Sequence, residues 1–474
     1  MAKTKGFLEF QRQSTEYRPV DVRIQDYKEI EIPLTPEALR QQASRCIDCG
    51  IPFCHGTGCP VRNIIPEFND LVYQGRWRQA CEILHATNNL PEITGRVCPA
   101  PCETSCTLAI NDKPVTIRHI EYQIVERGFA EGWIKPQLAQ TKTGKSVAVI
   151  GSGPAGLSAA QQLARAGYDV TVFEKDEKPG GLLRYGIPDF KLEKWIIDRR
   201  LEQMKAEGVK FHNGVNVGVD ISAHYLQTLF DGICITMGAG KPRDLTVPGR
   251  DLGGIHFAME LLWQQNKTTV DESFDVSKRI DAKGKNVLVI GGGDTGSDCI
   301  GTSRRHGAKS ITQIEILPQP PQDIPQDTPW PMWPRQMRTS SSQAEGCNRM
   351  WSIATKKFVG DTTGVKEVHI CIVDWKQEKG AWIMTEVPGS ETVIKAELVL
   401  LAMGFVHVEH NQLITDLKLE LDTRGNIKAN RYQTNVPRVF AAGDAISGAS
   451  LVVRAIDSGR QAAEAIDAWF KKKG

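Results

Sequence analysis

Two segments of the chain, 140 residues apart, share one pattern: an apolar strand-like run, a turn with three regularly spaced glycines, and a helix-like stretch. The first is SVAVIGSGPAGLSAAQQLARAG from Ser146, and the second is KNVLVIGGGDTGSDCIGTSRRHGA from Lys285. Strand, glycine turn, helix and a further strand indicate a parallel sheet with helices packed on it. The repeat therefore predicts an α/β fold with two Rossmann-like dinucleotide-binding domains.

In the first repeat, each glycine of the G-x-G-x-x-G turn has a physical role. The first permits the tight turn, the second lets the backbone approach a pyrophosphate, and the third lets helix and strand pack closely. The helix N-terminus then faces the phosphates. The following strand, YDVTVFEK, ends with Glu174, whose carboxylate can hold the ribose hydroxyls of an adenosine. The predicted phosphate-binding residues are Gly151, Gly153, Pro154, Ala155 and Gly156.

The second repeat predicts a second nucleotide site at Gly291, Gly293, Asp294, Thr295 and Gly296. Arg304 and Arg305 end its helix, and arginines near such a site favour a 2′-phosphate and hence NADPH. Alternatively, these two arginines complement the helix dipole and stay solvated. Glu315, on the next strand, points to NADH instead. The choice between the two nucleotides therefore stays open.

Two nucleotide sites in one chain indicate a flavin and a nicotinamide. The segment TNVPRVFAAGDAISGAS predicts a strand that ends at Gly443 and Asp444, and in flavoproteins with two dinucleotide domains such an aspartate lies against the ribityl chain of FAD. Strand-then-glycine segments at 233–240 and 398–405 predict the crossings between the domains. We therefore expect a Cys-rich helical domain at 1–143, a discontinuous FAD domain at 144–260 and 405–474, and an inserted NAD(P)H domain at 261–404.

Composition excludes several classes of partner. The 474 residues carry a net charge of +2, and 41% of them are hydrophobic, as in an ordinary globular protein. A near-neutral charge gives no reason to expect nucleic-acid binding, and no apolar run approaches the roughly 18 residues of a membrane span. The start, MAKTKGFLEFQRQ, lacks the apolar stretch of a secretory signal. We expect a cytoplasmic protein with neither nucleic-acid nor membrane partners.

Eight of the twelve cysteines lie between Cys46 and Cys106. Seven of them form two groups, CIDCGIPFCHGTGCP and CPAPCETSC, whereas Cys81 lies on the apolar face of a predicted helix and is expected in the core. Cytosolic thiols stay reduced, so clustered cysteines more often bind metal or perform chemistry. Seven thiols in two groups fit two iron–sulfur clusters with one non-cysteine ligand, and a structural zinc site is the alternative.

A flavin reduced by NAD(P)H needs an electron acceptor. In one class of flavoproteins the acceptor is a redox disulfide formed by a close cysteine pair. The remaining cysteines are far apart in the sequence and are expected to be small buried side chains; they are Cys234, Cys299, Cys347 and Cys371. The N-terminal thiols are then the expected acceptor site, because iron–sulfur clusters carry electrons and zinc has no redox role.

The segment LPQPPQDIPQDTPWPMWP, residues 317–334, is dense in proline and tryptophan. Proline removes backbone donors and fixes φ, so this segment is expected to be irregular chain. A packed surface loop is the first interpretation, and a lid or docking element is the alternative for so long a loop.

Together these motifs resemble the small (beta) subunits of NAD(P)H-dependent glutamate synthases. The resemblance covers nearly the whole chain. It rests on CIDCGIPFCHGTGCP, GRVCPAPCETSC, VAVIGSGPAGL, PGGLLRYGIPDFKLEK, VIGGGDTGSDCIGTS, EILPQPP with PWPMWP, and FAAGDAISGASLVVRAI. Related flavoprotein subunits that feed pyrimidine reduction or ferredoxin form the alternative, and the EILPQPP and PWPMWP stretches favour glutamate synthase over them.

The resemblance implies two [4Fe–4S] clusters. The ligands of one would be Cys46, Cys49, Cys54 and Cys106. The ligands of the other would be Cys59, Cys98 and Cys102, completed by a carboxylate or amide that falls at Glu121. The alternative for Glu121 is an exposed acid on a helix. The same resemblance adds Gly181 and Leu182, in PGGLLRYG, to the FAD site.

The resemblance also implies an electron-input role. NADPH or NADH would be oxidised at FAD, and electrons would pass through the clusters to a large (alpha) subunit that carries glutaminase and FMN chemistry and makes L-glutamate from L-glutamine and 2-oxoglutarate. This chain begins Met1-Ala2, and three domains take up its length, so the nucleophile of the glutaminase is expected on the other polypeptide. No catalytic acid or base is predicted here, because hydride transfer to flavin needs none from this chain.

Overall fold

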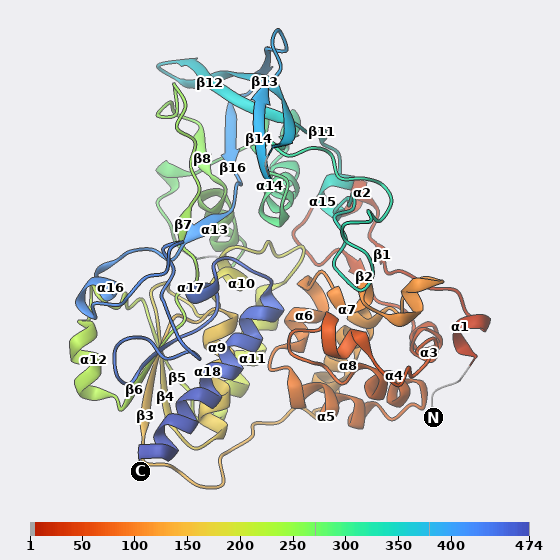
Figure 1. The fold of residues 1–474 in the computed structure, drawn as a ribbon, viewed down its shortest axis with the longest axis vertical. Helices are drawn as coiled ribbons and strands as arrows, with labels where there is room; N and C mark the ends of the chain where they lie inside the picture. Colours follow the sequence, from red (N-terminus) through yellow and green to blue (C-terminus); the bar gives the residue numbers. More distant parts are fainter. Residues whose placement is uncertain (1–4, 271, 379, 474) are drawn as a thin grey trace.

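The structure is a computed structural model that describes residues 5–270, 272–378 and 380–473. A helical N-terminal part and a parallel sheet lie side by side, and a second parallel sheet lies above them (Figure 1). This arrangement confirms the predicted fold class, with two Rossmann-like units preceded by a helical segment.

The N-terminal part consists of short helices joined by loops that carry the cysteines. The helix predicted around Cys81 is present as α5, and in α3 Thr35 caps the helix by accepting a hydrogen bond from the Ala38 backbone N–H (3.2 Å). The helices are α1 (Gly6–Glu9), α2 (Val20–Arg23), α3 (Pro36–Ser44), α4 (Ile65–Tyr73), α5 (Trp77–Thr87), α6 (Pro91–Val97), α7 (Pro101–Thr104) and α8 (Ile117–Ala130). β1 (Glu16–Tyr17) pairs antiparallel with β2 (Glu31–Ile32), with α2 between them in the sequence, and single turns occupy Cys54–Gly58 and Thr107–Ile110.

The first sheet has five parallel strands in the order β18-β6-β3-β4-β5. Its central strands are apolar on both faces, as expected where helices cover a parallel sheet on both sides. The strands are β3 (Ser146–Ile150), β4 (Asp169–Glu174), β5 (Lys210–Asn213), β6 (Gly232–Ile235) and β18 (Val439–Ala441). The helices are α9 (Pro154–Arg165), α10 (Leu182–Tyr185), α11 (Lys194–Ala206), α12 (Ala223–Leu229), α16 (Gln412–Asp416), α17 (Asp444–Ser447) and α18 (Val452–Lys473).

The second sheet also has five parallel strands, in the order β11-β10-β9-β16-β8. They are β8 (Ile255–Phe257), β9 (Asn286–Ile290), β10 (Ser310–Ile314), β11 (Asn348–Met350) and β16 (Leu398–Leu401). Its helices are α13 (Ala258–Thr269), α14 (Asp294–Arg305) and α15 (Ser341–Ala344), with a single turn at Val276–Lys278. An antiparallel sheet extends this unit at the top of Figure 1, and it contains β12 (Ile353–Asp361), β13 (Gly364–Glu378), β14 (Ala381–Glu386) and β15 (Thr392–Lys395).

The two units are joined where β7 (Lys241–Pro242) pairs with β17 (Phe405–His407). The outgoing crossing differs from the expected boundary at residue 260. β8 already pairs with β16 of the second sheet, so the chain crosses between Pro242 and Ile255. The strand-then-glycine segment at 233–240 predicts a crossing after it. It does not indicate that the short run at Ile255–Phe257 pairs with a strand of the second sheet.

Helix α18 closes the first unit by packing along α9. At the crossing point Gly459 comes so close that a Cβ there would overlap the carbonyl oxygen of Ala155. Among the described residues, no helix has both the length and the apolar character required to cross a bilayer. The segment 317–334 contains neither helix nor strand, as its prolines predict.

Candidate functional site

The first glycine turn joins β3 to α9 and has the geometry of a phosphate cradle. Gly151 adopts φ +99°, and a Cβ there would lie 2.6 Å from the carbonyl oxygen of Thr236. A Cβ at Gly156 would overlap the carbonyl oxygen of Gly151, whereas the space beside Gly153 is open. The first and third glycines are therefore required by packing, and the second leaves room beside the backbone N–H groups at the start of α9.

Two further turns enclose this cradle. Gly181 precedes α10, adopts φ +52° and packs against the first turn. A Cβ at Gly181 would lie 3.0 Å from the Cα of Gly153. Gly443, at φ +68° before α17, faces Ala155, whose Cβ would lie 2.7 Å from a Cβ on this glycine. The structure thus brings the predicted FAD residues of three distant segments together; they are Gly151, Gly153, Pro154, Ala155, Gly156, Gly181, Leu182, Gly443 and Asp444.

Glu174 ends β4 beside the first turn. Its carboxylate accepts hydrogen bonds from the backbone N–H (3.1 Å) and the hydroxyl of Ser152, and from the Asp176 backbone N–H (2.9 Å). The side chain is buried, and Ser152 holds it next to the place where the backbone faces the pyrophosphate. This is the position from which a carboxylate binds the ribose of a dinucleotide, so the residues present fit FAD.

Asp444 begins α17, and its side chain accepts a hydrogen bond from the Ser450 hydroxyl (2.9 Å). Burial raises the pKa of this carboxyl group, and the bond to Ser450 acts in the opposite direction. A buried carboxylate gains from further donors, and the hydroxyls of a ribityl chain would supply them.

The second glycine turn repeats this geometry between β9 and α14. Gly291 adopts φ +120°, and a Cβ at this residue would overlap the carbonyl oxygen of Ala402. A Cβ at Gly296 would overlap the carbonyl oxygen of Gly291, and the space beside Gly293 is again open. Asp294 and Thr295 form the first turn of α14. The turn can therefore receive a second dinucleotide in the same way.

Glu315 directly follows β10, and its backbone continues the pairing with β11 through a hydrogen bond from its N–H to the Met350 carbonyl (2.9 Å). Its carboxylate lies against Gly292, so close that a Cβ on this glycine would overlap both carboxylate oxygens. The acid therefore lies at the strand end beside the glycine turn.

The structure does not place Arg304 and Arg305 at the nucleotide turn. They end α14, about 16 Å from its N-terminus at 1.5 Å per residue. The Arg305 side chain is buried and donates hydrogen bonds to Glu345 (2.7 Å) and to the Asp26 carbonyl (2.9 Å). It therefore joins the N-terminal segment to the second unit, and the expected role in recognising a 2′-phosphate has no structural support.

The seven predicted cluster cysteines come from two segments that touch. Gly58 lies against Cys102, whose Cα would be 2.7 Å from a Cβ at this glycine, and the Ser105 hydroxyl donates to the Phe53 carbonyl (3.3 Å). Backbone N–H groups of Asn63 and Ala100 donate to sulfur atoms of Cys59 and Cys98 (3.5 and 3.4 Å), an arrangement common around cluster thiolates.

The thiols fall into two sets by their strongest charged neighbours. Cys46 is influenced by Cys106 and Cys49, and Cys54 by Cys106, Cys46 and Cys49. Cys98 is influenced by Glu121 and Cys59, and Cys102 by Cys59, Glu103, Cys98 and Glu121. We call the first set A (Cys46, Cys49, Cys54 and Cys106) and the second set B (Cys59, Cys98, Cys102 and Glu121).

Burial is the main influence on these thiols. It raises the pKa of Cys46 to about 11, and it raises the pKa values of Cys59 and Cys98 to about 12. Buried thiols of this kind become thiolates when iron supplies the compensating positive charge. Among the described residues, no three thiol, imidazole or carboxylate groups are close enough to hold a single ion. In a cubane cluster, by contrast, each thiolate binds a different iron atom.

Glu121 is not the exposed helix acid of the alternative interpretation, because only 6% of it is accessible. Its carboxylate accepts hydrogen bonds from the side-chain amides of Asn88 (3.1 Å) and Asn63 (3.3 Å) and from the Thr94 hydroxyl. Burial raises its pKa to about 7, and the hydrogen bond from Thr94 acts against this shift. The carboxylate therefore lies near the three thiols of set B, where it could serve as the fourth ligand of a cluster.

The Pro- and Trp-rich segment reaches from the second unit to set A. The Trp330 ring packs on Phe53, with 4.8 Å between ring centroids, and its indole N–H donates to the carbonyl oxygen of Cys106 (3.2 Å). The segment is therefore a surface loop that packs through Trp330 on cysteine-bearing chain.

Several residues that support these sites had not been anticipated. Thr236 and Gln313 each donate a side-chain hydrogen bond to the carbonyl of the first glycine of a turn (2.9 Å in both). Ser152, the second residue of the first motif, could have been predicted as a partner of Glu174, because a hydroxyl at this position lies beside the acid at the strand end. The partners of Glu121 are loop and helix residues with no such pattern. Cys234, Cys299 and Cys371 are buried as expected, Cys81 is in the core, and Cys347 is only half-buried.

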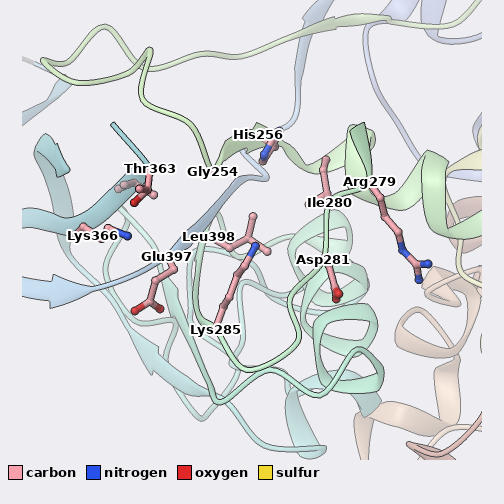
Figure 2. A pocket seen from close by; sticks show the side chains of 11 residues that line it. Gly254, His256, Arg279, Ile280, Asp281, Lys285, Thr363, Lys366, Glu397 and Leu398 are labelled. Atoms are coloured by element: carbon pink, nitrogen blue, oxygen red, sulfur yellow. The ribbon is translucent and has the colours of Figure 1, made fainter. Parts of the chain in front are cut away.

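A pocket of about 390 Å³ lies at the other end of the second sheet. Gly254, Lys285 and Glu397 directly precede β8, β9 and β16, so the pocket opens at the amino ends of the strands (Figure 2). Dinucleotides bind at the carboxyl ends of parallel strands, so this pocket is distinct from the predicted nucleotide site.

Comparison with known proteins assigns both halves of the chain. Residues 145–459 match the family profile described as pyridine nucleotide-disulphide oxidoreductase, and residues 23–133 match the profile described as dihydropyrimidine dehydrogenase domain II, 4Fe-4S cluster. The "Glutamate synthase [NADPH] small chain" of Mycobacterium tuberculosis is 50% identical over 99% of this chain and 96% of its own length. The chain belongs to the family of glutamate synthase small chains. It is accordingly an NAD(P)H-dependent flavoprotein oxidoreductase with a [4Fe–4S] domain.

One further relative and one solved structure extend the comparison. "Glutamate synthase [NADH]" of Schizosaccharomyces pombe is 46% identical over 99% of this chain, which spans 23% of that protein. The structure of FprA from Mycobacterium tuberculosis in complex with NADPH superposes on 69% of this chain, which is 85% of the FprA chain, with a TM-score of 0.55. At 17% sequence identity this similarity shows a shared fold alone. The resemblance drawn from the sequence is confirmed, and the [4Fe–4S] profile decides against zinc.

Proposed function

We propose that this chain is the electron-input subunit of a glutamate synthase. It oxidises NADPH or NADH at FAD and passes electrons through two [4Fe–4S] clusters to a large (alpha) subunit. That partner carries the glutaminase and FMN chemistry and makes L-glutamate from L-glutamine and 2-oxoglutarate. The observation that carries the proposal is the presence, in one chain of this family, of two glycine cradles and two separate sets of buried cluster ligands.

The first cradle is proposed to hold FAD. Gly151, Gly153, Pro154, Ala155 and Gly156 would face the pyrophosphate, and Glu174 would bind the adenosine ribose. Gly181 and Leu182 would line the isoalloxazine side, and Asp444, after Gly443, would bind the ribityl chain. FAD supplies the conversion of a two-electron donor into single electrons, and this chain supplies binding, orientation and exclusion of water.

The second cradle is proposed to bind NAD(P)H through Gly291, Gly293, Asp294, Thr295 and Gly296. Its open space at Gly293 supports approach of a pyrophosphate. No side chain acts as an acid or base in this scheme, and we propose no catalytic residue.

Set A and set B are proposed to hold one [4Fe–4S] cluster each. We propose that electrons from FAD reach set B first, because a chain of contacts joins set B to the FAD cradle. Glu121 accepts a hydrogen bond from Asn88, and the neighbouring Asn89 donates to Gln161 of α9 (2.7 Å) and accepts from Arg460 of α18 (2.6 Å). Gly459, next to Arg460, backs onto Ala155 of the FAD cradle. This continuous path supports transfer from FAD to set B first.

Set A is then the exit toward the partner. Cys49 is only half-buried, and the nearby Ile51 and Ile110 expose 76% and 52% of their surfaces. Exposed apolar side chains beside an electron exit suit a surface that another subunit covers. The fungal relative, in which a chain of this kind spans 23% of a longer protein named glutamate synthase, supports close association with the remaining activities.

The domain limits proposed from the sequence are 1–143, 144–260 with 405–474, and 261–404, with the outgoing crossing moved to the segment between β7 and β8. A cytoplasmic location is part of the proposal, because reduced thiols are needed to assemble the clusters.

The test is anaerobic purification of the complex with its large subunit, followed by iron and sulfide analysis and reduction by NAD(P)H. We expect flavin bleaching followed by a paramagnetic iron signal and glutamate formation. Cys54→Ala should remove iron from set A and abolish glutamate formation while NAD(P)H still reduces the flavin. Cys81→Ala, a buried thiol outside both sets, is the matched control. Full glutamate formation in the Cys54→Ala protein would refute the route through set A.

A further inference from the structure

The second nucleotide turn carries a carboxylate that the proposed function leaves unused. Glu315 follows β10, and its carboxylate lies against Gly292, the middle residue of the glycine turn. Among the described residues, no hydrogen bond to this carboxylate is made by another side chain or backbone group. It is partly accessible, so an arriving ligand can reach it.

The same arrangement exists in the first unit. There Glu174 ends β4, and its carboxylate binds Ser152, the middle residue of that turn. The two acids thus occupy matching places, each at the end of the second strand and against the second residue of the turn. Such a carboxylate accepts hydrogen bonds from the 2′- and 3′-hydroxyls of the adenosine ribose, which is the mark of an NAD site.

A 2′-phosphate would meet this carboxylate as a like charge. NADPH carries the phosphate on the hydroxyl that Glu315 would bind, so the carboxylate loses its donor and gains a repelling anion. The predicted counter-charges, Arg304 and Arg305, lie at the far end of α14.

Two other arginines lie nearer the turn, and each packs on a tryptophan ring, while Arg338 also acts electrostatically on Asp294 of the turn. Arg349 stacks on Trp351 (4.8 Å to the ring centroid) and donates to the Arg338 carbonyl (3.1 Å), while the Arg338 guanidinium lies over the Trp333 ring (3.7 Å). Arg349 also acts electrostatically on Glu315, which partly offsets its charge. The Glu315 carboxylate lies directly against the turn at Gly292, whereas neither arginine donates a hydrogen bond to the turn among the described residues.

We infer that Glu315 is a specificity-determining residue that makes NADH the preferred electron donor. This inference rests on the proposed function, in which the 291–296 turn binds the nicotinamide nucleotide. Curated relatives carry both [NADPH] and [NADH] in their names, so family membership does not decide the donor.

The test uses the holoenzyme and two readouts. Anaerobic stopped-flow reduction of the flavin should give a ratio of the reduction rate constant to the dissociation constant that is about tenfold or more higher for NADH than for NADPH. Calorimetric titration should show ADP-ribose binding more tightly than 2′-phospho-ADP-ribose. In Glu315→Gln both preferences should shrink severalfold. Glu391→Gln, which changes an exposed glutamate of the same unit, should leave both preferences unchanged.

A wild-type enzyme that prefers NADPH, or an unchanged ratio in Glu315→Gln, would overturn the inference. The two proposals fail differently. If neither nucleotide reduces the flavin, the proposed function fails, and the comparison of ADP-ribose with its 2′-phosphate still decides the role of Glu315.

Discussion

The two glycine turns share one local geometry, but their surroundings differ. The turn at 151–156 is covered by the Gly181 turn, by α17 through Gly443, and by α18 through Gly459. The turn at 291–296 is bounded by the ends of its own sheet, through Ala402 and Gln313, and by Glu315. Among the described residues, α17 and α18 contact the glycines of the first turn and do not contact those of the second turn.

This difference teaches how one repeated unit serves two roles. A cofactor retained through many turnovers gains from an enclosed site, whereas a substrate that enters and leaves needs an accessible one. The enclosed turn suits a resident FAD, and the open turn suits an exchanging nucleotide. Variants made in pairs, one in each turn, can break or sharpen this division.

The largest effect is expected from valine at the third glycine of each turn. In Gly156→Val the new side chain would overlap the Gly151 carbonyl and crowd the Thr236 hydroxyl, so α9 must shift, at a cost of about 1–3 kcal/mol in stability or more. We expect this protein to purify without FAD. Gly296→Val makes the equivalent clash with Gly291 and should retain FAD but lose reduction by NAD(P)H.

The FAD-to-protein ratio and anaerobic flavin reduction measure both outcomes. Loss of FAD from Gly296→Val, with retention in Gly156→Val, would reverse the assignment of the two turns.

The next effect concerns the acid of the enclosed turn. Glu174→Gln removes a buried charge that accepts hydrogen bonds from Ser152 and, when FAD is bound, from the ribose. Hydrogen bonds to a charged group contribute about 1.5–3 kcal/mol, so the dissociation constant of FAD should rise about tenfold or more. Release of FAD on dilution, followed by flavin fluorescence, measures this. Glu202→Gln, on the exposed face of α11, is the control and should behave as wild type.

The glycine turns could be predicted because their requirement is local. Gly151 and Gly291 need positive φ, and Gly156 and Gly296 leave no room for a Cβ, so the spacing alone carries the geometry. Glu174 could be assigned for the same reason, since strand length places it.

The role of Arg305 could not be predicted, because it depends on Glu345, 40 residues away, and on Asp26, 279 residues away. A pair of arginines after a helix has the same appearance in the sequence whether it binds a phosphate or joins two parts of a fold. The role of Glu315 could not be assigned from the sequence, because the sequence does not show that β10 ends at Ile314.

The cysteine spacing predicts that clusters bind, but the separation of the thiols into two sets needs tertiary structure. Gly58 must lie against Cys102 for the two cysteine segments to interleave. The surroundings of Glu121 come from Asn63, Asn88 and Thr94, none of which belongs to a recognisable motif.

A smaller effect tests the cover of the enclosed turn. Gly443→Ala places a Cβ in the positive-φ region, at about 1–2 kcal/mol, and brings it 2.7 Å from the Ala155 Cβ. Gly448→Ala has the same conformational cost at φ +77°, but its nearest neighbour is the Asn426 amide at 3.7 Å. We expect both variants to melt at lower temperature and only Gly443→Ala to lose FAD during gel filtration. Equal loss of FAD from the two would show that α17 does not close the cradle.

The smallest effects should come from the side chains that hold the first carbonyl of each turn. The Thr236 hydroxyl donates to the Gly151 carbonyl, with the Ile150 carbonyl also within reach (3.0 Å), and Gln313 donates to the Gly291 carbonyl. A neutral bond contributes about 0.5–1.5 kcal/mol. Thr236→Val should therefore raise the dissociation constant of FAD severalfold and leave the KM of the nicotinamide nucleotide unchanged. Gln313→Leu should do the opposite. Because neither side chain is proposed to touch a ligand, a cross-effect would mean that the two turns communicate through the sheets, and the division into a resident and an exchanging site would then be incomplete.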